Sequence, residues 1–200
     1  IMLGMHAPSG TDGFLAHTLT SKILELTVNG SPMSEAELFT ASVARSGVSP
    51  LFLSGCPLIC RHAEAKINGL STFPITGNDK VSETARIKWR KRLAHQTIAQ
   101  TMNSADRPYV PEGPFHASVR LNHRRRTVAR MARQWGYAFD NTTVYLEAAD
   151  LISLYRQLIC LVYLNRFTEV SLPLVLPLHN LIGRLGLVWA KNNAAMTVKS

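Results

Sequence analysis

The sequence contains little cysteine and little charge, and it has neither an internal repeat nor a low-complexity tract. Three cysteines among 200 residues are too few for a disulfide-stapled scaffold, and they predict reduced thiols in a cytoplasmic protein. Charged residues make up 18% and hydrophobic residues 46% of the chain, a balance that excludes a disordered tail or a collagen-like chain. A chain of 200 residues with this composition is expected to form one ordinary domain, or a domain with a small appendage.

The sequence also lacks a convincing membrane span. Its most apolar stretch, residues 172–190, is interrupted by two prolines, a histidine, an asparagine and an arginine. We therefore expect residues 166–200 to form an apolar C-terminal arm or tail that packs on the body of the protein or on a neighbouring subunit. Residues 1–165 are expected to form the larger part of one domain, without membrane association.

The formal net charge of +9 comes mainly from residues 81–140, which carry 12 Lys and Arg against 4 Asp and Glu. A basic stripe of this kind can bind phosphates. However, no aromatic residue interleaves with the arginines at 124–126, and no zinc-finger or RNA-binding signature is present. We therefore favour a solvated helix face, and a nucleic-acid or anion-binding module ranks last among the candidate functions.

Apolar runs of strand length alternate with helical patterns along the chain. The expected strands are residues 1–5, 22–28, 50–54, 71–76, 115–121 and 142–146. The expected helices are residues 35–46, 57–66, 82–102, 124–135 and 148–164, with a loop over 104–114. Asn29-Gly30 predicts a tight turn, and Ser34 with Glu37 predicts a capping box. This alternation predicts an α/β fold of three layers with a largely parallel sheet.

The chain opens on Ile1-Met2-Leu3-Gly4, a run that is typical of a buried strand rather than of a natural N-terminus. We therefore expect that the sequence is truncated at its N-terminus. In parallel sheets the chemistry lies at the carboxyl ends of the strands, which directs attention to the residues after this first strand.

Two histidines and a carboxylate follow the first strand and are candidates for zinc chemistry. His6 comes at the end of the strand, His17 follows eleven residues later, and Glu35 begins a helix. Neutral imidazole and carboxylate oxygen both bind Zn²⁺ at about 2.0–2.2 Å. Their spacing alone leaves a second interpretation open, in which the histidines form structural hydrogen bonds and Glu35 is a first-turn acid that favours the helix dipole.

The combined string resembles the zinc D-aminopeptidase family of the DppA type. The resemblance is carried by Gly4-Met5-His6-Ala7, Gly10-Thr11, Gly13, Leu15-Ala16-His17-Thr18, Val28-Asn29-Gly30, Glu35, the run at 47–55 and Glu64. It covers about residues 1–165 and is specific over residues 1–65.

The resemblance implies that His6 and Glu35 are zinc ligands and that His17 is the catalytic residue, as a nucleophile or as an acid/base and transition-state stabiliser. It further implies two zinc ions, short peptides with N-terminal D-residues as substrates, a cytoplasmic location and a homo-oligomer in the form of a ring. A pair of zinc ions can polarise a carbonyl and generate hydroxide near neutral pH.

The sequence departs from the family in its metal ligands. The family's Asp-x-Glu pair and a further ligating His precede the strand at which this sequence starts. Ser34 replaces a Gly before Glu35, and Cys56 stands where the family usually has Asp. The chain is therefore expected to be a metallo-aminopeptidase if the missing ligands are supplied. The alternative is a truncated or degenerate, catalytically inactive homologue that acts as a structural subunit.

Overall fold

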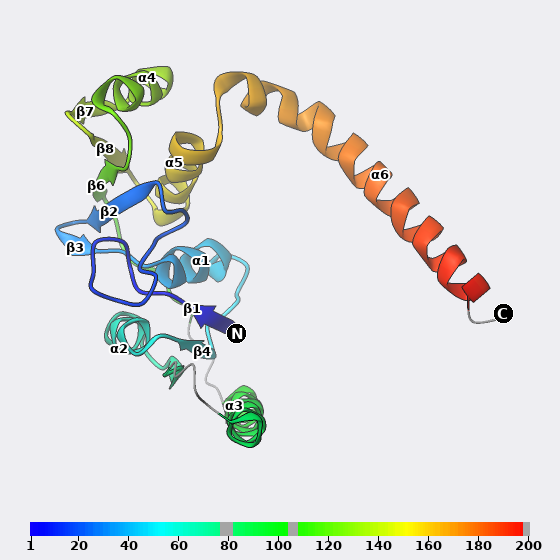
Figure 1. Ribbon diagram of the computed structural model, residues 1–200. Coiled ribbons are helices and arrows are strands. Elements are labelled where there is room, and N and C mark those ends of the chain that lie inside the picture. Colours follow the sequence, from blue (N-terminus) through cyan, green and yellow to red (C-terminus); the bar gives the residue numbers. More distant parts are fainter. Residues whose placement is uncertain (77–81, 104–107, 198–200) are drawn as a thin grey trace. The chain divides into compact units, whose positions relative to one another are not determined.

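The computed structural model describes residues 1–76, 82–103 and 108–197. The chain forms two compact units, residues 1–162 and residues 163–200 (Figure 1). The strands are β1 (Met2–Met5), β2 (Ile23–Val28), β3 (Ser31–Pro32), β4 (Phe52–Gly55), β5 (Ser71–Pro74), β6 (Phe115–Leu121), β7 (Ala138–Asp140) and β8 (Thr143–Ala148). The helices are α1 (Glu35–Ala44), α2 (Pro57–Lys66), α3 (Glu83–Asn103), α4 (Arg125–Trp135), α5 (Leu151–Tyr163) and α6 (Arg166–Thr197). Residues 104–107 of the predicted loop lie outside the described residues.

The α/β class is confirmed, and the predicted parallel sheet is present as three strands in the order β1-β4-β5. Both strand pairs of this sheet are parallel, and β4 is buried along its whole length. An apolar cluster beneath the sheet includes Leu53 of β4 and Ile59 and Ala63 of α2. The carboxyl ends of the three strands therefore lie at one edge, where β1 delivers His6.

A second sheet holds five strands in the order β3-β2-β6-β8-β7, and all of its pairs are antiparallel. This separate sheet was not predicted, because two of its strands, β3 and β7, are too short to be recognised in the sequence. In β7, only three residues pair with β8, and the hairpin between them has Asn141 at a φ of 50°. This hairpin reverses the chain after α4, so β8 runs antiparallel to β6 instead of parallel to it.

The turn between β2 and β3 agrees with the prediction from Asn29-Gly30. Both residues have a positive φ, 49° and 78°, as a tight hairpin turn requires. The Asn29 side chain also accepts a hydrogen bond from the His116 amide and donates one to the Pro114 carbonyl, so the turn is anchored to the start of β6.

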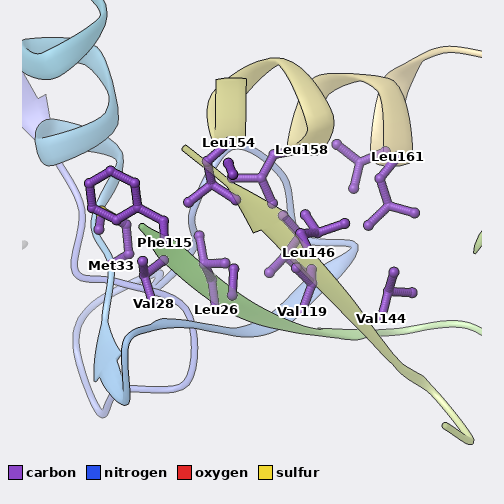
Figure 2. Close-up of a cluster of buried hydrophobic side chains, with 14 of the residues drawn as sticks. Leu26, Val28, Met33, Phe115, Val119, Val144, Leu146, Leu154, Leu158 and Leu161 are labelled. Atoms are coloured by element: carbon purple, nitrogen blue, oxygen red, sulfur yellow. The ribbon is translucent and has the colours of Figure 1, made fainter. Parts of the chain in front are cut away.

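The larger core lies between the antiparallel sheet and α5. Strand β6 alternates between buried and more exposed side chains, as the period of a half-buried strand requires. Figure 2 shows Leu154, Leu158 and Leu161 of α5 directed toward the strands that carry Val119 and Leu146. This packing covers one face of the sheet.

Helix α4 carries much of the positive charge on its solvent side. Val128, Ala129 and Ala132 are buried, whereas the arginines at 124–126 and 130 are exposed. The helix ends at Gly136, whose φ of 74° is left-handed and whose amide donates to the Ala132 and Arg133 carbonyls. The structure thus supports the solvated helix face for this part of the basic segment.

The second unit consists mainly of α6, which contains Pro173 and Pro177. Proline removes a backbone donor and bends a helix. Within the described residues no single helix is long and apolar enough to span a membrane. Two segments, Arg166–Pro173 and Val175–Leu187, are bent by 60° relative to each other. Only when they are taken together do they have the length and apolar composition of a membrane span.

Candidate metal and catalytic site

His6 stands where β1 ends, at the edge of the parallel sheet. Its Nδ1 lies 3.3 Å from the Phe14 carbonyl oxygen, and its ring is tilted against the Phe14 ring with centroids 6.1 Å apart. Because a carbonyl oxygen can only accept, Nδ1 carries the hydrogen in this contact. The lone pair of His6 therefore resides on Nε2, which is the nitrogen left to bind a metal.

His17 is held in the loop that follows β1. Its amide donates to the Ala7 carbonyl at 3.0 Å, and this bond closes the loop back onto the residue next to His6. The His17 Nδ1 donates to the Leu15 carbonyl at 2.7 Å. His17 therefore also keeps a lone pair on Nε2. Leu15 has a φ of 47°, a left-handed conformation that a leucine rarely adopts and that turns its carbonyl toward the imidazole.

Two buried hydroxyl groups lock the same loop. The Ser9 amide donates to Thr18 Oγ1 at 3.1 Å, and the Thr18 amide donates to Ser9 Oγ at 2.7 Å. Each hydroxyl then donates onward, Ser9 to the Ile23 carbonyl and Thr18 to the Met33 carbonyl. The second bond ties the His17 loop to the residue that precedes the cap of α1, so the histidine and the start of the helix are positioned together.

Glu35 is the first residue of α1, where a carboxylate favours the helix dipole. Ser34 is the N-cap, and its side chain accepts from the Glu37 amide while the Glu37 carboxylate accepts from the Ser34 amide. This capping box confirms the prediction made from Ser34 and Glu37. Such a cap is worth about 1 kcal/mol and fixes the direction in which Glu35 leaves the helix.

The three predicted site residues come together from three separate segments. The ring centroids of His6 and His17 are 5.0 Å apart, and His17 Nε2 lies 3.9 Å from Glu35 Oε2. The side chains of His17 and Glu35 are 32% and 20% exposed, so solvent and substrate can reach them. The cluster thus offers two imidazole nitrogens and a carboxylate at the carboxyl end of a parallel strand.

The donor chemistry of this cluster fits zinc. A metal-bound histidine usually donates its second N–H to a carbonyl or carboxylate, and His6 and His17 both do so. The number of ligands falls short of a complete site, because the described residues include no group of three or more His, Cys, Asp or Glu with the arrangement of a metal centre. A structural or catalytic zinc ion takes three or four protein ligands.

A buried polar network behind Glu35 was not predicted from the sequence. His62 Nε2 of α2 lies 2.7 Å from Glu37 Oε2, and the Tyr109 hydroxyl donates to Glu37 Oε1 at 3.5 Å. The Glu37 side chain is only 3% exposed. Burial opposes its ionisation, but the hydrogen bonds from His62 and Ser34 outweigh that effect and hold the Glu37 pKa below its usual value. Burial and the neighbouring Glu37 carboxylate raise the pKa of Tyr109.

Sequence reasoning missed the roles of four residues in this region: Ser9, Thr18, His62 and Tyr109. The hydroxyl pair carried a local signal, since Ser9 and Thr18 flank the His17 loop. The Glu37–His62 contact carried none, because the pairing depends on how α1 packs against α2. The cysteines Cys56, Cys60 and Cys160 are buried and form no disulfide, and Cys56 and Cys60 belong to the apolar cluster beneath the parallel sheet.

Comparisons with known proteins identify a family and a fold for this chain. A family model described as D-aminopeptidase (peptidase M55) matches residues 1–160. Among solved structures, the chain is similar to a Zn-dependent D-aminopeptidase, DppA from Bacillus subtilis, which is described as a self-compartmentalizing protease. The TM-score is 0.60 at 19% identity, over 80% of this chain and 61% of that one, so the likeness shows a shared fold. The chain thus spans about three fifths of that relative's length. A comparison with curated proteins gave no match.

Proposed function

We propose, from the premise that this chain belongs to the D-aminopeptidase family of peptidases, that it takes part in the zinc-dependent hydrolysis of short peptides after an N-terminal D-amino acid. The observation that carries the proposal is the convergence of His6, His17 and Glu35 from three segments of the chain. These residues supply nitrogen and oxygen donors of the kind that zinc prefers.

In this proposal His6 and Glu35 are the zinc ligands, His6 through Nε2 and Glu35 through its carboxylate. Bound zinc would polarise the scissile carbonyl and lower the pKa of a water molecule, and the family resemblance implies two such ions. Further ligands are needed beyond those that the described residues bring together.

His17 is the proposed catalytic residue. Its Nδ1–H is occupied by the Leu15 carbonyl, so its Nε2 can accept a proton and return it to the leaving amine. The carboxylate of Glu35, the proposed zinc ligand, lies 3.9 Å from that nitrogen, so the proton would move close to the metal. The two loop hydroxyl groups keep the imidazole in place while the proton moves.

A competing proposal is a catalytically inactive homologue that acts as a structural subunit. It is favoured by one observation, the incomplete set of metal ligands among the described residues. The two proposals differ in what the 200-residue chain does by itself. The structural subunit would bind neither two zinc ions nor a D-aminoacyl anilide productively.

Both proposals are tested on the full chain after incubation with zinc and removal of the excess. We expect release of p-nitroaniline from D-alanyl p-nitroanilide, at least about 100-fold faster than from the L-alanyl compound, with zinc retained in elemental analysis. Hydrolysis that is absent while the chain remains folded, together with less than one zinc ion per chain, would instead show that these 200 residues are inactive by themselves, as the competing proposal states.

We further propose a homo-oligomeric ring in the cytoplasm, in which residues 166–200 form an arm distinct from the domain of residues 1–165. The ring is supported by the description of the Bacillus subtilis relative as self-compartmentalizing, and the location by the low cysteine content, which is typical of proteins with reduced thiols. Light scattering after size-exclusion chromatography measures the assembly, and a monomer at micromolar concentration would contradict the ring.

A further inference from the structure

A pocket of about 520 Å³ opens beside His6 at the carboxyl edge of the parallel sheet. It lies at the ends of all three strands, since Met5 ends β1, Gly55 ends β4 and Ile75 follows β5. Ligands of α/β proteins bind in this position, and the volume falls within the range of small-molecule sites. We call this feature the His6 pocket and define it by its principal lining residues: Met5, His6, Phe14, Cys56, Pro57 and Ile75.

The walls of the His6 pocket are mainly apolar, and none of the described lining residues is a lysine, arginine, aspartate or glutamate. Thioether, phenyl, thiol, pyrrolidine and aliphatic groups line the space, and the polar side chains among the described lining residues are the His6 imidazole and the Thr76 hydroxyl. The backbone at its base is already paired, because the Cys56 amide donates to the Met5 carbonyl and the Ile75 amide donates to the Gly55 carbonyl. A charged group entering this space would therefore lose hydration without gaining a partner of opposite charge among the described lining residues.

Phe14 is the second observation that points to an apolar ligand. Its side chain is 71% exposed although it lines the pocket, and its ring stands against the His6 imidazole. The Phe14 carbonyl also orients His6. The same residue therefore forms a wall of the pocket and holds the proposed metal ligand, so that a side chain in the pocket would lie next to the reacting centre. Burial of the exposed ring by a ligand would be favourable.

We propose that the His6 pocket is the subsite for the side chain of the N-terminal D-residue and that it selects uncharged, apolar side chains larger than a methyl group. This inference rests on the proposed function, and it adds a substrate class to it. The volume accommodates a leucine or phenylalanine side chain, and the uncharged walls disfavour lysine and aspartate side chains. Phe14 is the specificity-determining residue, because its exposed ring lies beside His6 and belongs to neither of the two buried apolar clusters.

The first test measures hydrolysis by the full zinc-loaded chain. Its substrates are the D-alanyl, D-leucyl, D-lysyl and D-aspartyl p-nitroanilides. We expect kcat/KM for D-leucyl to exceed that for D-lysyl and D-aspartyl by at least about 10-fold, the discrimination that a hydrophobic pocket provides. Phe14→Ala should lower the ratio of D-leucyl to D-alanyl by about 10-fold. Phe167→Ala, which removes an exposed phenyl ring from α6, is the matched control and should leave the ratio unchanged.

The second test detects occupancy of the pocket without catalysis. Methionine methyl groups are labelled with ¹³C, and the chain is titrated with D-leucinol or D-lysinol, which carry the amine and the side chain but no bond to hydrolyse. The Met5 methyl signal should shift with D-leucinol at an at least fivefold lower concentration than with D-lysinol. The Met131 methyl in α4, outside the pocket, serves as the internal reference. Phe14→Ala should weaken the Met5 response, and Phe167→Ala should not.

The outcomes separate this inference from the proposed function. Equal hydrolysis of apolar and charged D-aminoacyl anilides, with no effect of Phe14→Ala, overturns the subsite while the peptidase proposal stands. If the Met5 signal shifts with D-leucinol and Phe14→Ala weakens that shift, the subsite is supported. If no anilide is hydrolysed in the same experiments, the subsite still stands and the peptidase proposal fails. A Met5 methyl signal that does not shift at a high concentration of D-leucinol overturns the subsite.

Discussion

His62 Nε2 lies 2.7 Å from Glu37 Oε2, and this contact joins α2 to the first turn of α1. The same carboxylate oxygen accepts from the amide and the hydroxyl of Ser34, the residue that caps the helix. Glu37 therefore bonds to the second helix on one side and to the cap on the other. Because Glu35 lies between the cap and Glu37 in sequence, the network holds the proposed zinc ligand on a rigid helix end.

Glu37→Gln is predicted to lower the free energy of unfolding at neutral pH by about 2 kcal/mol, because the hydrogen bonds at Oε2 then lose their ionised acceptor. The pKa of Glu37 is lower in the folded state than its ordinary value of 4.5. The ionised carboxylate therefore stabilises the fold at pH values above 4.5. That stabilisation is lost as the pH falls through the lower pKa of the folded state. Urea denaturation of both proteins between pH 7 and pH 3 should show a difference that shrinks on acidification.

The control for this prediction is Glu147→Gln. Glu147 also faces a histidine, with its carboxylate 3.7 Å from His116 Nδ1, but its side chain is 83% exposed. Exposed pairs contribute little, so this variant should unfold close to the wild type at every pH. A difference for Glu37→Gln that stays constant or grows below pH 4 would show that the carboxylate is not ionised in the fold.

Much of the fold follows from the sequence because its signals are local. Helix α2 and strand β6 begin and end where the pattern predicts, and the Asn29-Gly30 turn forms as its backbone preferences require. The antiparallel sheet was missed because β3 and β7 are two and three residues long. No period can be recognised over so few residues, yet β7 decides the direction of β8.

The candidate site, like the fold, could be predicted from the sequence only in part. The residue types of His6, His17 and Glu35 and the family resemblance together predict a site, and the structure places the three residues next to one another. Their roles as ligands and catalyst stay predictions. The capping box that holds Glu35 follows from a local pattern, whereas the Glu37–His62 contact does not, since it joins residues 25 positions apart in the chain. Such a pairing is set by tertiary packing, which no short pattern encodes.

Gly55→Ala is predicted to destabilise the parallel sheet by about 1–3 kcal/mol, the usual cost of overpacking. A Cβ at this position would collide with the Met5 carbonyl, and it would lie 2.6 Å from Ile59 Cγ2. Since β1 would have to shift, zinc binding through His6 should weaken as well. Thermal unfolding and zinc titration of Gly55→Ala and Gly186→Ala provide the measurement. Gly186 has open space around it, so an equal loss in both variants would contradict the packing argument.

Ser9→Ala is predicted to loosen the His17 loop. The variant leaves the Thr18 amide and the Ile23 carbonyl without their buried partner, at a cost of about 2 kcal/mol. Native-state hydrogen exchange should then be faster at the His17 amide, which bonds to the Ala7 carbonyl across the loop. Ser42→Ala, which removes a hydroxyl that bonds only within α1, is the control. Unchanged exchange at His17 would mean that the hydroxyl pair does not close the loop.

His17→Ala is predicted to abolish hydrolysis of a D-alanyl anilide while leaving the zinc content unchanged. The Nε2 of His17 is the proposed proton carrier, and loss of a general acid–base usually costs at least about 100-fold in rate. His6→Ala and Glu35→Gln remove proposed ligands instead, so they should lower both zinc content and activity. Rates and bound zinc are measured on the same preparations, with circular dichroism as a check of folding. Full activity in His17→Ala would refute the role of His17, and loss of zinc in that variant would make it a ligand.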